Sequence, residues 1–300
     1  MMNIAIAGGT GFIGKHLIKA LTAGGHHVYI LSRKPAETEQ KNISYVLWQN
    51  DGALPERELP EIEVWINLAG ATIFGRWTEK TKADILQSRL QSVKESARII
   101  QEQKVKPNVY IQGSAVGIYG TSADKTFTET SSVSDGDFLS RTAAAWEKEA
   151  KQIEALGIRT ICMRFGVVLG KDGGALSKMA LPYQWFAGGR IGSGRQWMSW
   201  IHIDDAAGII QSAIQNSHLS GPVNVTAPNP VRMETFGKTV AKVKNRPHWL
   251  HVPGFALKTV LGEMSLLILK GQRAIPEKSL SNGYHFRYQT IEDALLDLLV

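Results

Sequence analysis

The sequence predicts an α/β fold in which a doubly wound parallel sheet is followed by a smaller C-terminal lobe. Short apolar strands alternate with segments of helical periodicity, the pattern of a parallel sheet covered by helices. The first strand runs directly into a glycine-rich turn at 8–14. The composition, 43% hydrophobic and 20% charged over 300 residues, is that of a globular chain. This length allows one large domain or two modest ones.

The first part of the chain follows a strand, helix, strand order. An apolar strand at 3–7 precedes a helix whose apolar residues recur from Phe12 to Leu21, and Gly24-Gly25 ends that helix before a strand at 27–31. Two parallel strands joined by a helix within about 30 residues form a βαβ unit. Further strands are predicted at 43–48, 64–68, 109–112 and 160–164, and helices at 78–104 and 138–156.

The composition changes after Gly166. Residues 170–200 are rich in glycine and tryptophan, which predicts a shaped binding loop more than regular elements. A strand at 201–203 leads to Asp204-Asp205, the candidate N-cap of a helix at 206–213. A strand at 223–226 and helical stretches near 233–244 and 254–270 follow. We expect a first domain over 1–165, with its core continuing into 200–227, and a substrate lobe mainly over 166–300.

The glycine turn predicts a dinucleotide site. Residues 9–14 have the spacing G-x-G-x-x-G, and they follow a strand, open a helix and lie in a βαβ unit, the context that gives this motif its meaning. Glycines let the backbone turn tightly and approach a pyrophosphate, which the free N–H groups at the helix start bind. The alternative is a merely flexible turn. The predicted Rossmann-type contacts are Gly8, Thr10, Gly11, Phe12, Ile13 and Gly14.

The end of the second strand favours NADP(H) over NAD. An NAD site usually places an acid there, about 20 residues beyond the glycines, to bind the ribose 2′-OH. This chain has Ser32, Arg33 and Lys34 at that place, and the nearest acid, Glu37, follows Pro35. A guanidinium and an ammonium neutralise a 2′-phosphate, to which the serine can donate. The alternative is an exposed basic loop.

Several other segments, in the right order, resemble the extended short-chain dehydrogenase/reductase superfamily. Some match the superfamily as a whole, and others are similar to its atypical branch, whose members are named epimerase family or nucleoside-diphosphate-sugar epimerase-like proteins. The general matches are Asn67–Gly70, Ser114–Gly120 and Ile201–Asp205. The atypical matches are Arg164–Gly170, Gly192–Trp197, Gly271–Arg273 and Pro276. The resemblance implies an oxidoreductase or epimerase-like enzyme.

The catalytic pair of that superfamily is missing. The resemblance implies a Tyr-x-x-x-Lys pair, in which lysine lowers the tyrosine pKa so that the phenolate can move a proton. None of the seven tyrosines is followed by lysine at this distance, and in the helix that includes 138–147 the expected tyrosine and lysine positions carry small or apolar residues. Ser114 at a strand end and Tyr119 nearby are the candidate catalytic residues. In the alternative, Ser114 caps backbone groups, Tyr119 packs, and the chain is a non-catalytic NADP(H)-binding regulatory or interaction protein.

The resemblance implies further contacts on both ligands. Arg164 is equally an ion-pair partner or a ligand, while His202 and Cys162, on apolar strands, are predicted core residues. The additional cofactor contacts are Leu68, Ala69, Gly70, Asp84, Arg89 and Val168. The substrate contacts are Trp185, Arg195 and Trp197, the rings stacking on a sugar and the guanidinium binding a diphosphate. In the alternative the tryptophans only anchor the loop.

The net charge and the cysteine content limit which partners and sites the chain can have. A net charge of +7 favours anionic partners, and the basic stretch Lys238–Arg246 is predicted to be a solvated helix face, with nucleic-acid contact as the alternative. The single cysteine excludes an intrachain disulfide framework and a multi-cysteine zinc site. Without a signal pattern or a spanning segment of about 20 apolar residues, we expect a cytoplasmic monomer or homodimer. Its partner is predicted to be a small carbonyl compound or nucleotide sugar, without metal, nucleic acid or membrane.

Overall fold

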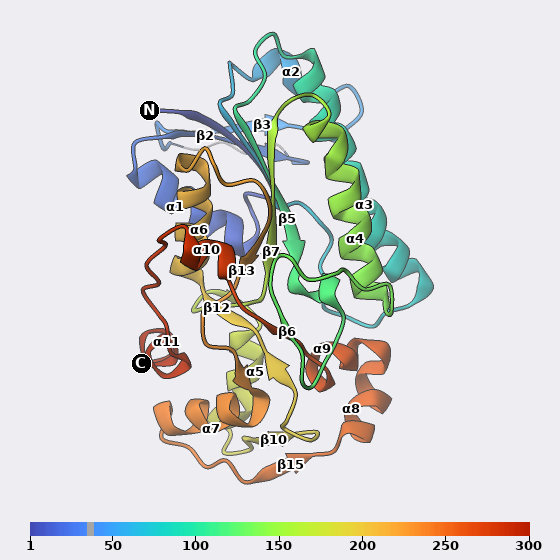
Figure 1. Ribbon diagram of the computed structural model, residues 1–300, viewed down its shortest axis with the longest axis vertical. Coiled ribbons are helices and arrows are strands. Elements are labelled where there is room, and N and C mark those ends of the chain that lie inside the picture. Colours follow the sequence, from blue (N-terminus) through green and yellow to red (C-terminus); the bar gives the residue numbers. More distant parts are fainter. Residues whose placement is uncertain (35–38) are drawn as a thin grey trace.

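A seven-stranded parallel sheet forms the centre of the upper half of the molecule (Figure 1). The computed structural model describes residues 1–34 and 39–300. The strand order is β13-β7-β5-β4-β1-β2-β3, so the order reverses between β1 and β4, the place where such sheets bind ligands. The predicted fold class is confirmed. The strands are β1 (Asn3–Ala7), β2 (His27–Ser32), β3 (Ile43–Leu47), β4 (Val64–Asn67), β5 (Val109–Ala115), β7 (Arg159–Phe165) and β13 (Gly221–Val225).

Alternating residues of the central strands build a separate core on each face of the sheet. In β1, Ile4 and Ile6 pack in the cluster that includes helices α1 (Phe12–Ala23) and α6 (Ile203–Gln215). The intervening Ala5 and Ala7 pack in the cluster that includes α3 (Glu79–Glu102) and α4 (Phe138–Glu154). Both helix pairs are visible on opposite sides of the sheet in Figure 1. Because both faces are covered, the strands read as continuous apolar runs.

The caps of the helices set where they begin. The Thr78 hydroxyl accepts the N–H of Thr81, 3.1 Å away, at the start of α3. At the start of α4, Asp137 and Ser140 form a reciprocal capping box, in which the Asp137 carboxylate accepts the Ser140 N–H at 2.8 Å. Helices α3 and α4 pack side by side, α3 against β4 and α4 against β5 and β7.

A smaller lobe hangs below the sheet and has its own core, which includes Trp200, Phe236 and Leu295 (Figure 1). Within the described residues, no helix is both long and apolar enough to cross a bilayer. The lobe's helices are α5 (Leu176–Gln184), α7 (Met233–Val243), α8 (Gly254–Leu261), η2 (Gly262–Ser265), α9 (Leu266–Leu269) and α11 (Ile291–Leu299). Helix α10 (Glu277–Ser281) packs instead against β13 of the central sheet. The lobe's short strands are β8 (Val167–Gly170), β9 (Gly173–Gly174), β10 (Gly189–Ile191), β11 (Trp197–Met198), β12 (Trp200–His202), β14 (Val231–Arg232), β15 (Leu250–Val252) and β16 (Arg273–Ala274). The remaining elements are α2 (Pro55–Glu58), η1 (Val116–Tyr119) and β6 (Thr126–Phe127).

Several predicted boundaries in this lobe were wrong. The supposed loop at 170–200 contains α5, which continues through Pro182. The helix after β12 begins at Ile203, and its N-cap is His202, whose Nδ1 accepts the Asp204 N–H at 3.1 Å, so Asp204-Asp205 lies in the first turn. The helical stretch at 254–270 is broken at Gly262, whose φ of +58° ends α8. The glycine-rich composition hid α5, and a histidine cap is an uncommon signal.

Candidate functional site

The turn between β1 and α1 has room only for glycine at two positions. Gly8 has φ +81°, and a Cβ there would lie 2.7 Å from the Leu68 carbonyl carbon. At Gly14 a Cβ would lie 2.7 Å from the Gly9 Cα, which is also backbone. The Gly11 N–H donates to the Gly8 carbonyl at 3.0 Å and closes the turn. The motif is therefore a sterically required loop, rather than a flexible one, that ends on the first turn of α1.

The N-terminus of α1 is free to bind an anion. Its N-cap residue is Gly11, no side chain caps it, and the first turn contains no acidic residue. The first N–H groups of a helix have no partner within the helix and carry partial positive charge. Thr10 and Gly11 are exposed, so a ligand can reach these groups. The donor set fits the diphosphate of a dinucleotide.

Phe12 has a second role that the sequence did not indicate. Its ring fills a slot whose walls are glycines of β8 and β9: a Cβ at Gly170 or Gly173 would lie 2.7 Å from the ring, and one at Gly174 would lie 2.8 Å away. The ring thereby fixes the start of α1 against β8, which carries Val168. Phe12, Ile13 and Val168 thus lie at one edge of the sheet.

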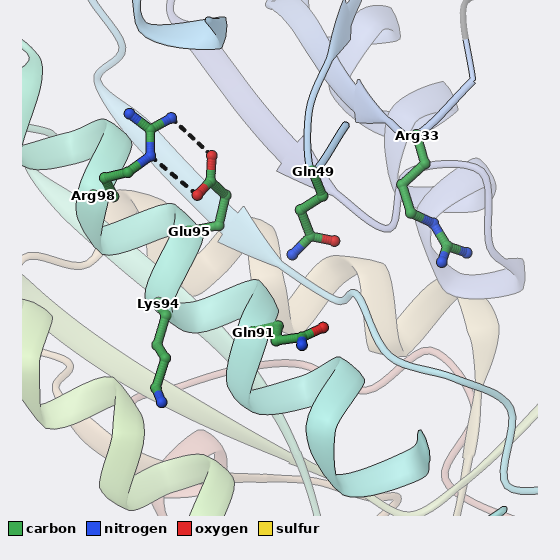
Figure 2. A pocket seen from close by; sticks show the side chains of 6 residues that line it. All are labelled: Arg33, Gln49, Gln91, Lys94, Glu95 and Arg98. Carbon is green, nitrogen blue, oxygen red and sulfur yellow. Dashed lines mark hydrogen bonds and ion pairs between the residues drawn. The ribbon is translucent and has the colours of Figure 1, made fainter. Parts of the chain in front are cut away.

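Arg33 borders a hollow of about 500 Å³ at the end of β2 (Figure 2). Arg33 and Gln49 face this hollow from the strand side, and α3 forms the opposite side, as Figure 2 shows. Arg98 on α3 is neutralised by Glu95 at 2.8 Å, whereas in the described part of the chain Arg33 has no acidic partner. The Ser32 Oγ accepts the Lys34 N–H at 3.2 Å. Glu37, the acid considered above, lies outside the described residues.

Arg89 is a half-buried cation beside the end of β4. Its Nη1 donates to the carbonyls of Ala71, at 3.1 Å, and Ile85, at 2.9 Å, and its guanidinium lies over the Trp146 ring, 4.9 Å from the centroid. Among the described residues no carboxylate pairs with it, and burial lowers its pKa to about 10. A Cβ at Gly70 would lie 3.1 Å from this side chain, so a small residue is needed there.

The other residues predicted near this edge differ in position. Leu68 and Ala69 are half-buried directly after β4, and the Ala69 N–H donates to the Asn67 side chain at 3.1 Å. Asp84, by contrast, is exposed on α3, and within 1–34 and 39–300 its carboxylate makes no hydrogen bond or ion pair. The structure therefore brings Arg89 and Gly70 together but leaves Asp84 in solvent.

Ser114 and Tyr119 belong to one buried network. The Ser114 hydroxyl donates to Glu147 Oε1 at 2.6 Å, and Arg164 holds the same carboxylate with two bonds of 2.8 Å. Arg164 Nη1 also donates to the Tyr119 hydroxyl at 2.8 Å, which donates to Asn224 Oδ1 at 2.7 Å. The five side chains come from β5, α4, β7, η1 and β13. Sequence reasoning missed Glu147 and Asn224.

The pKa shifts of Tyr119 and Arg164 differ in their causes. Burial raises the pKa of Tyr119, and the positive charge of Arg164 offsets this only in part. Burial alone would lower the pKa of Arg164, but its bonds to Glu147 raise that pKa above its usual value. Arg164 and Glu147 therefore form a buried charged pair, as the ion-pair reading of Arg164 predicted. Tyr119 is 4% exposed, and its hydroxyl is both donor and acceptor within the protein.

The model of the NAD dependent epimerase/dehydratase family matches residues 4–226, which include the glycine turn and this whole network. The chain belongs to that family. Residues 252–298 match a domain of unknown function. The chain is 63% identical to the epimerase family protein YfhF of Bacillus subtilis, covering 99% of this chain and 98% of that protein. It is 42% identical to the epimerase family protein SSP1921 of Staphylococcus saprophyticus, covering 100% of each.

Solved structures of the family superpose over nearly the whole chain. Human epimerase family protein SDR39U1, solved with NADPH, is 32% identical with a TM-score of 0.88 and 99% coverage of both chains. A nucleoside-diphosphate sugar epimerase from Corynebacterium glutamicum is 29% identical with a TM-score of 0.79, covering 99% of this chain and 58% of that one. The predicted resemblance to atypical epimerase family proteins is confirmed. A nicotinamide dinucleotide as cofactor is confirmed at the level of the family.

The predicted substrate residues do not form one cluster. The Trp197 ring lies between the guanidinium groups of Arg232, at 3.7 Å, and Arg273, at 4.9 Å, and its Nε1 donates to the Ala123 carbonyl at 2.8 Å. Arg195 is exposed beside this stack and its carbonyl accepts a bond from Arg232. Trp185 is 76% exposed at the end of α5, and in the described ranges no ring contact joins it to Trp197.

The structure makes Trp200 a core residue and confirms the two predictions about His202 and Cys162. Trp200 is an anchor in the core, with its Nε1 donating to the Asn229 carbonyl at 2.9 Å. His202 is a satisfied buried residue, stacked on Tyr288 at 3.8 Å, with Nε2 3.2 Å from an Asp297 carboxylate oxygen. Cys162 is buried in β7, and burial raises the pKa of its thiol.

Proposed function

We propose that this chain binds NADP(H) and uses it as an atypical short-chain dehydrogenase/reductase, an oxidoreductase or an epimerase-like enzyme. The observation that carries the proposal is the uncapped start of α1, held by a turn that only glycine fits, beside Arg33 at the end of β2, which has no acidic partner among residues 1–34 and 39–300. An NAD site would have an acid in place of that guanidinium. The human relative solved with NADPH supports the choice of cofactor.

Each predicted cofactor residue has a place in this proposal. The N–H groups around Thr10–Ile13 bind the diphosphate, and the group formed by Ser32, Arg33 and Lys34 binds the 2′-phosphate. The backbone at 68–70, half-buried at Leu68 and Ala69 and exposed at Gly70, passes along the adenosine and the nicotinamide ribose, with Arg89 behind it. Val168 reaches the nicotinamide end through its backbone. Asp84, exposed on α3, remains a contact predicted from the resemblance alone.

The substrate lies between Ser114 and the lobe that we place at 166–300. Ser114 orients a carbonyl or hydroxyl group, and the stack of Arg232, Trp197 and Arg273 with the exposed Arg195 binds an anionic group of the substrate. A carbonyl compound or a nucleotide sugar meets both requirements. Fold neighbours of this chain were solved with UDP-glucose and with UDP-glucuronic acid, but at less than 25% identity.

A non-catalytic function is the second candidate, favoured by one observation. The Tyr119 hydroxyl is buried and fully engaged, so the phenol nearest to Ser114 is not free to move a proton to a substrate. In this case the bound NADP(H) would alter a surface of this chain that binds a partner, and no reaction would be catalysed.

Turnover of NADPH separates the two candidates. Purified protein is mixed with NADPH and a panel of carbonyl compounds headed by phenanthrenequinone, and the absorbance of reduced nicotinamide is followed. The enzyme proposal expects oxidation that Ser114→Ala lowers at least tenfold while NADPH affinity stays unchanged. Binding of NADPH without oxidation by any member of the panel supports the non-catalytic candidate. Absence of NADPH binding contradicts both.

A further inference from the structure

Glu147 lies where a substitute for the missing tyrosine–lysine pair would be needed. It projects from α4, the helix expected to carry that pair, and its carboxylate reaches Ser114 at the carboxyl end of β5. The Ser114 hydroxyl donates to Oε1 over 2.6 Å, a short bond of the kind formed with an ionised acceptor. The Glu147 side chain is 14% exposed, so the carboxylate retains some access to solvent.

Arg164 fixes the position of this carboxylate. Its Nε donates to Oε1 and its Nη2 to Oε2, each at 2.8 Å, and its side chain is 5% exposed. Such a two-point contact holds a carboxylate in one orientation. Oε1, which accepts from Arg164 and from Ser114 together, is therefore held as a proton acceptor for the Ser114 hydroxyl. Tyr119 cannot take this part because its own hydroxyl donates to Asn224.

Resting on the function proposed above, we propose that Glu147 exchanges the reaction's proton with the substrate through Ser114. In the oxidising direction Ser114 Oγ takes the proton of a substrate hydroxyl and passes its own proton to Glu147 Oε1. At the same time the substrate C–H bond breaks, and its hydrogen leaves with the electron pair to the oxidised nicotinamide. The substrate alcohol becomes a carbonyl, and Glu147 releases its proton to solvent. Reduction runs the same steps backwards. Glu147 is thus a positioning and proton-accepting residue that acts through Ser114.

The test compares four variants by calorimetric NADPH affinity and by kcat and KM with phenanthrenequinone. For Glu147→Gln we expect kcat to fall about 100-fold or more, as for loss of a general acid or base, with KM and NADPH affinity within about threefold. Ser114→Ala should show the same loss. Because both residues act in one step, the double variant should be no slower than the slower single variant. Glu154→Gln, an exposed acid on the same helix, is the matched control and should behave as the unmodified protein.

Glu147→Gln leaves Arg164 without its carboxylate and can fail to fold, so Glu147→Asp is measured beside it. Asp keeps the charge facing Arg164 but withdraws the oxygens from Ser114, and kcat should fall at least tenfold. A kcat within threefold of the unmodified value in either folded variant would overturn the inference. It would also be overturned if the loss of kcat in the double variant equalled the product of the losses in the Glu147→Gln and Ser114→Ala single variants. NADPH binding without turnover of any carbonyl in the panel would overturn it and leave the cofactor proposal standing. Failure to bind NADPH would instead overturn the proposed function itself.

Discussion

Replacing Gly14 with alanine sets two physical effects against each other at the cofactor turn. Alanine is favoured over glycine in a helix by about 1 kcal/mol, so helix propensity alone predicts a more stable protein. The new Cβ, however, would lie 2.7 Å from Gly9 Cα and 2.8 Å from the Gly9 carbonyl carbon, two backbone atoms that cannot rotate away. Such overpacking costs about 1–3 kcal/mol, and contacts this short belong at the upper end. We expect a net loss of about 2 kcal/mol in the free energy of unfolding.

The same substitution should weaken cofactor binding. Opening the turn moves the N–H groups at the start of α1, and loss of one hydrogen bond to a charged phosphate costs about 1.5–3 kcal/mol. NADPH affinity should therefore fall by about 10- to 100-fold in calorimetric titration. Gly25→Ala at the other end of α1 is the control: its φ of +79° is also strained for alanine, but no atom lies within 4 Å of the new Cβ. It should lower stability without changing affinity. A Gly14→Ala protein that binds NADPH normally and unfolds no earlier would refute the reasoning.

Three further substitutions test separate parts of the site and lobe. Arg33→Ser should lower NADPH affinity about 10- to 100-fold and NADH affinity less than twofold, because one phosphate pair is lost; equal losses in titration would contradict this. Arg89→Met should weaken the binding of both coenzymes by similar factors, since we place Arg89 behind the ribose that both coenzymes share, and a loss confined to NADPH would contradict this placement. Burial lowers the pKa of His202, so its contribution to stability is present above the usual value of about 6.5 and is lost as pH falls below it. His202→Asn keeps an N-cap acceptor that does not titrate, and denaturant unfolding from neutral to acidic pH should show a shallower loss of stability than the unmodified protein shows.

Local patterns in the sequence predicted the glycine turn, the end of β2 and the burial of His202. The strand, glycine turn and helix order at 3–21 needs only neighbours in sequence. The steric demand on Gly14 arises within the turn, whereas that on Gly8 comes from Leu68 and Ala69, which follow β4. Ser32 and Arg33 likewise need only neighbours in sequence, because their position at the end of β2 follows from the strand itself. His202 was predicted as a core residue because apolar residues flank it on a short strand.

The network around Ser114 could not be read from the sequence. Glu147 and Arg164 meet Ser114 only because α4 crosses β5 and β7, which lie side by side in the sheet. Asn224 reaches Tyr119 across 105 positions because β13 returns to pair with β7. One signal was available: a charged residue inside an apolar strand, such as Arg164 in β7, requires an opposite charge on the covering helix.

Calorimetry on protein freed of bound nucleotide tests the central claim most directly. Separate titrations give the affinities for NADPH and NADH. Binding of either coenzyme tests the diphosphate site at the start of α1, and the difference between the two affinities measures the contribution of Arg33 to binding the 2′-phosphate. We expect saturable binding of NADPH at one site, at least tenfold tighter than the binding of NADH. Equal affinity for the two coenzymes would contradict the assignment of Arg33, and no heat with either would contradict the dinucleotide site itself.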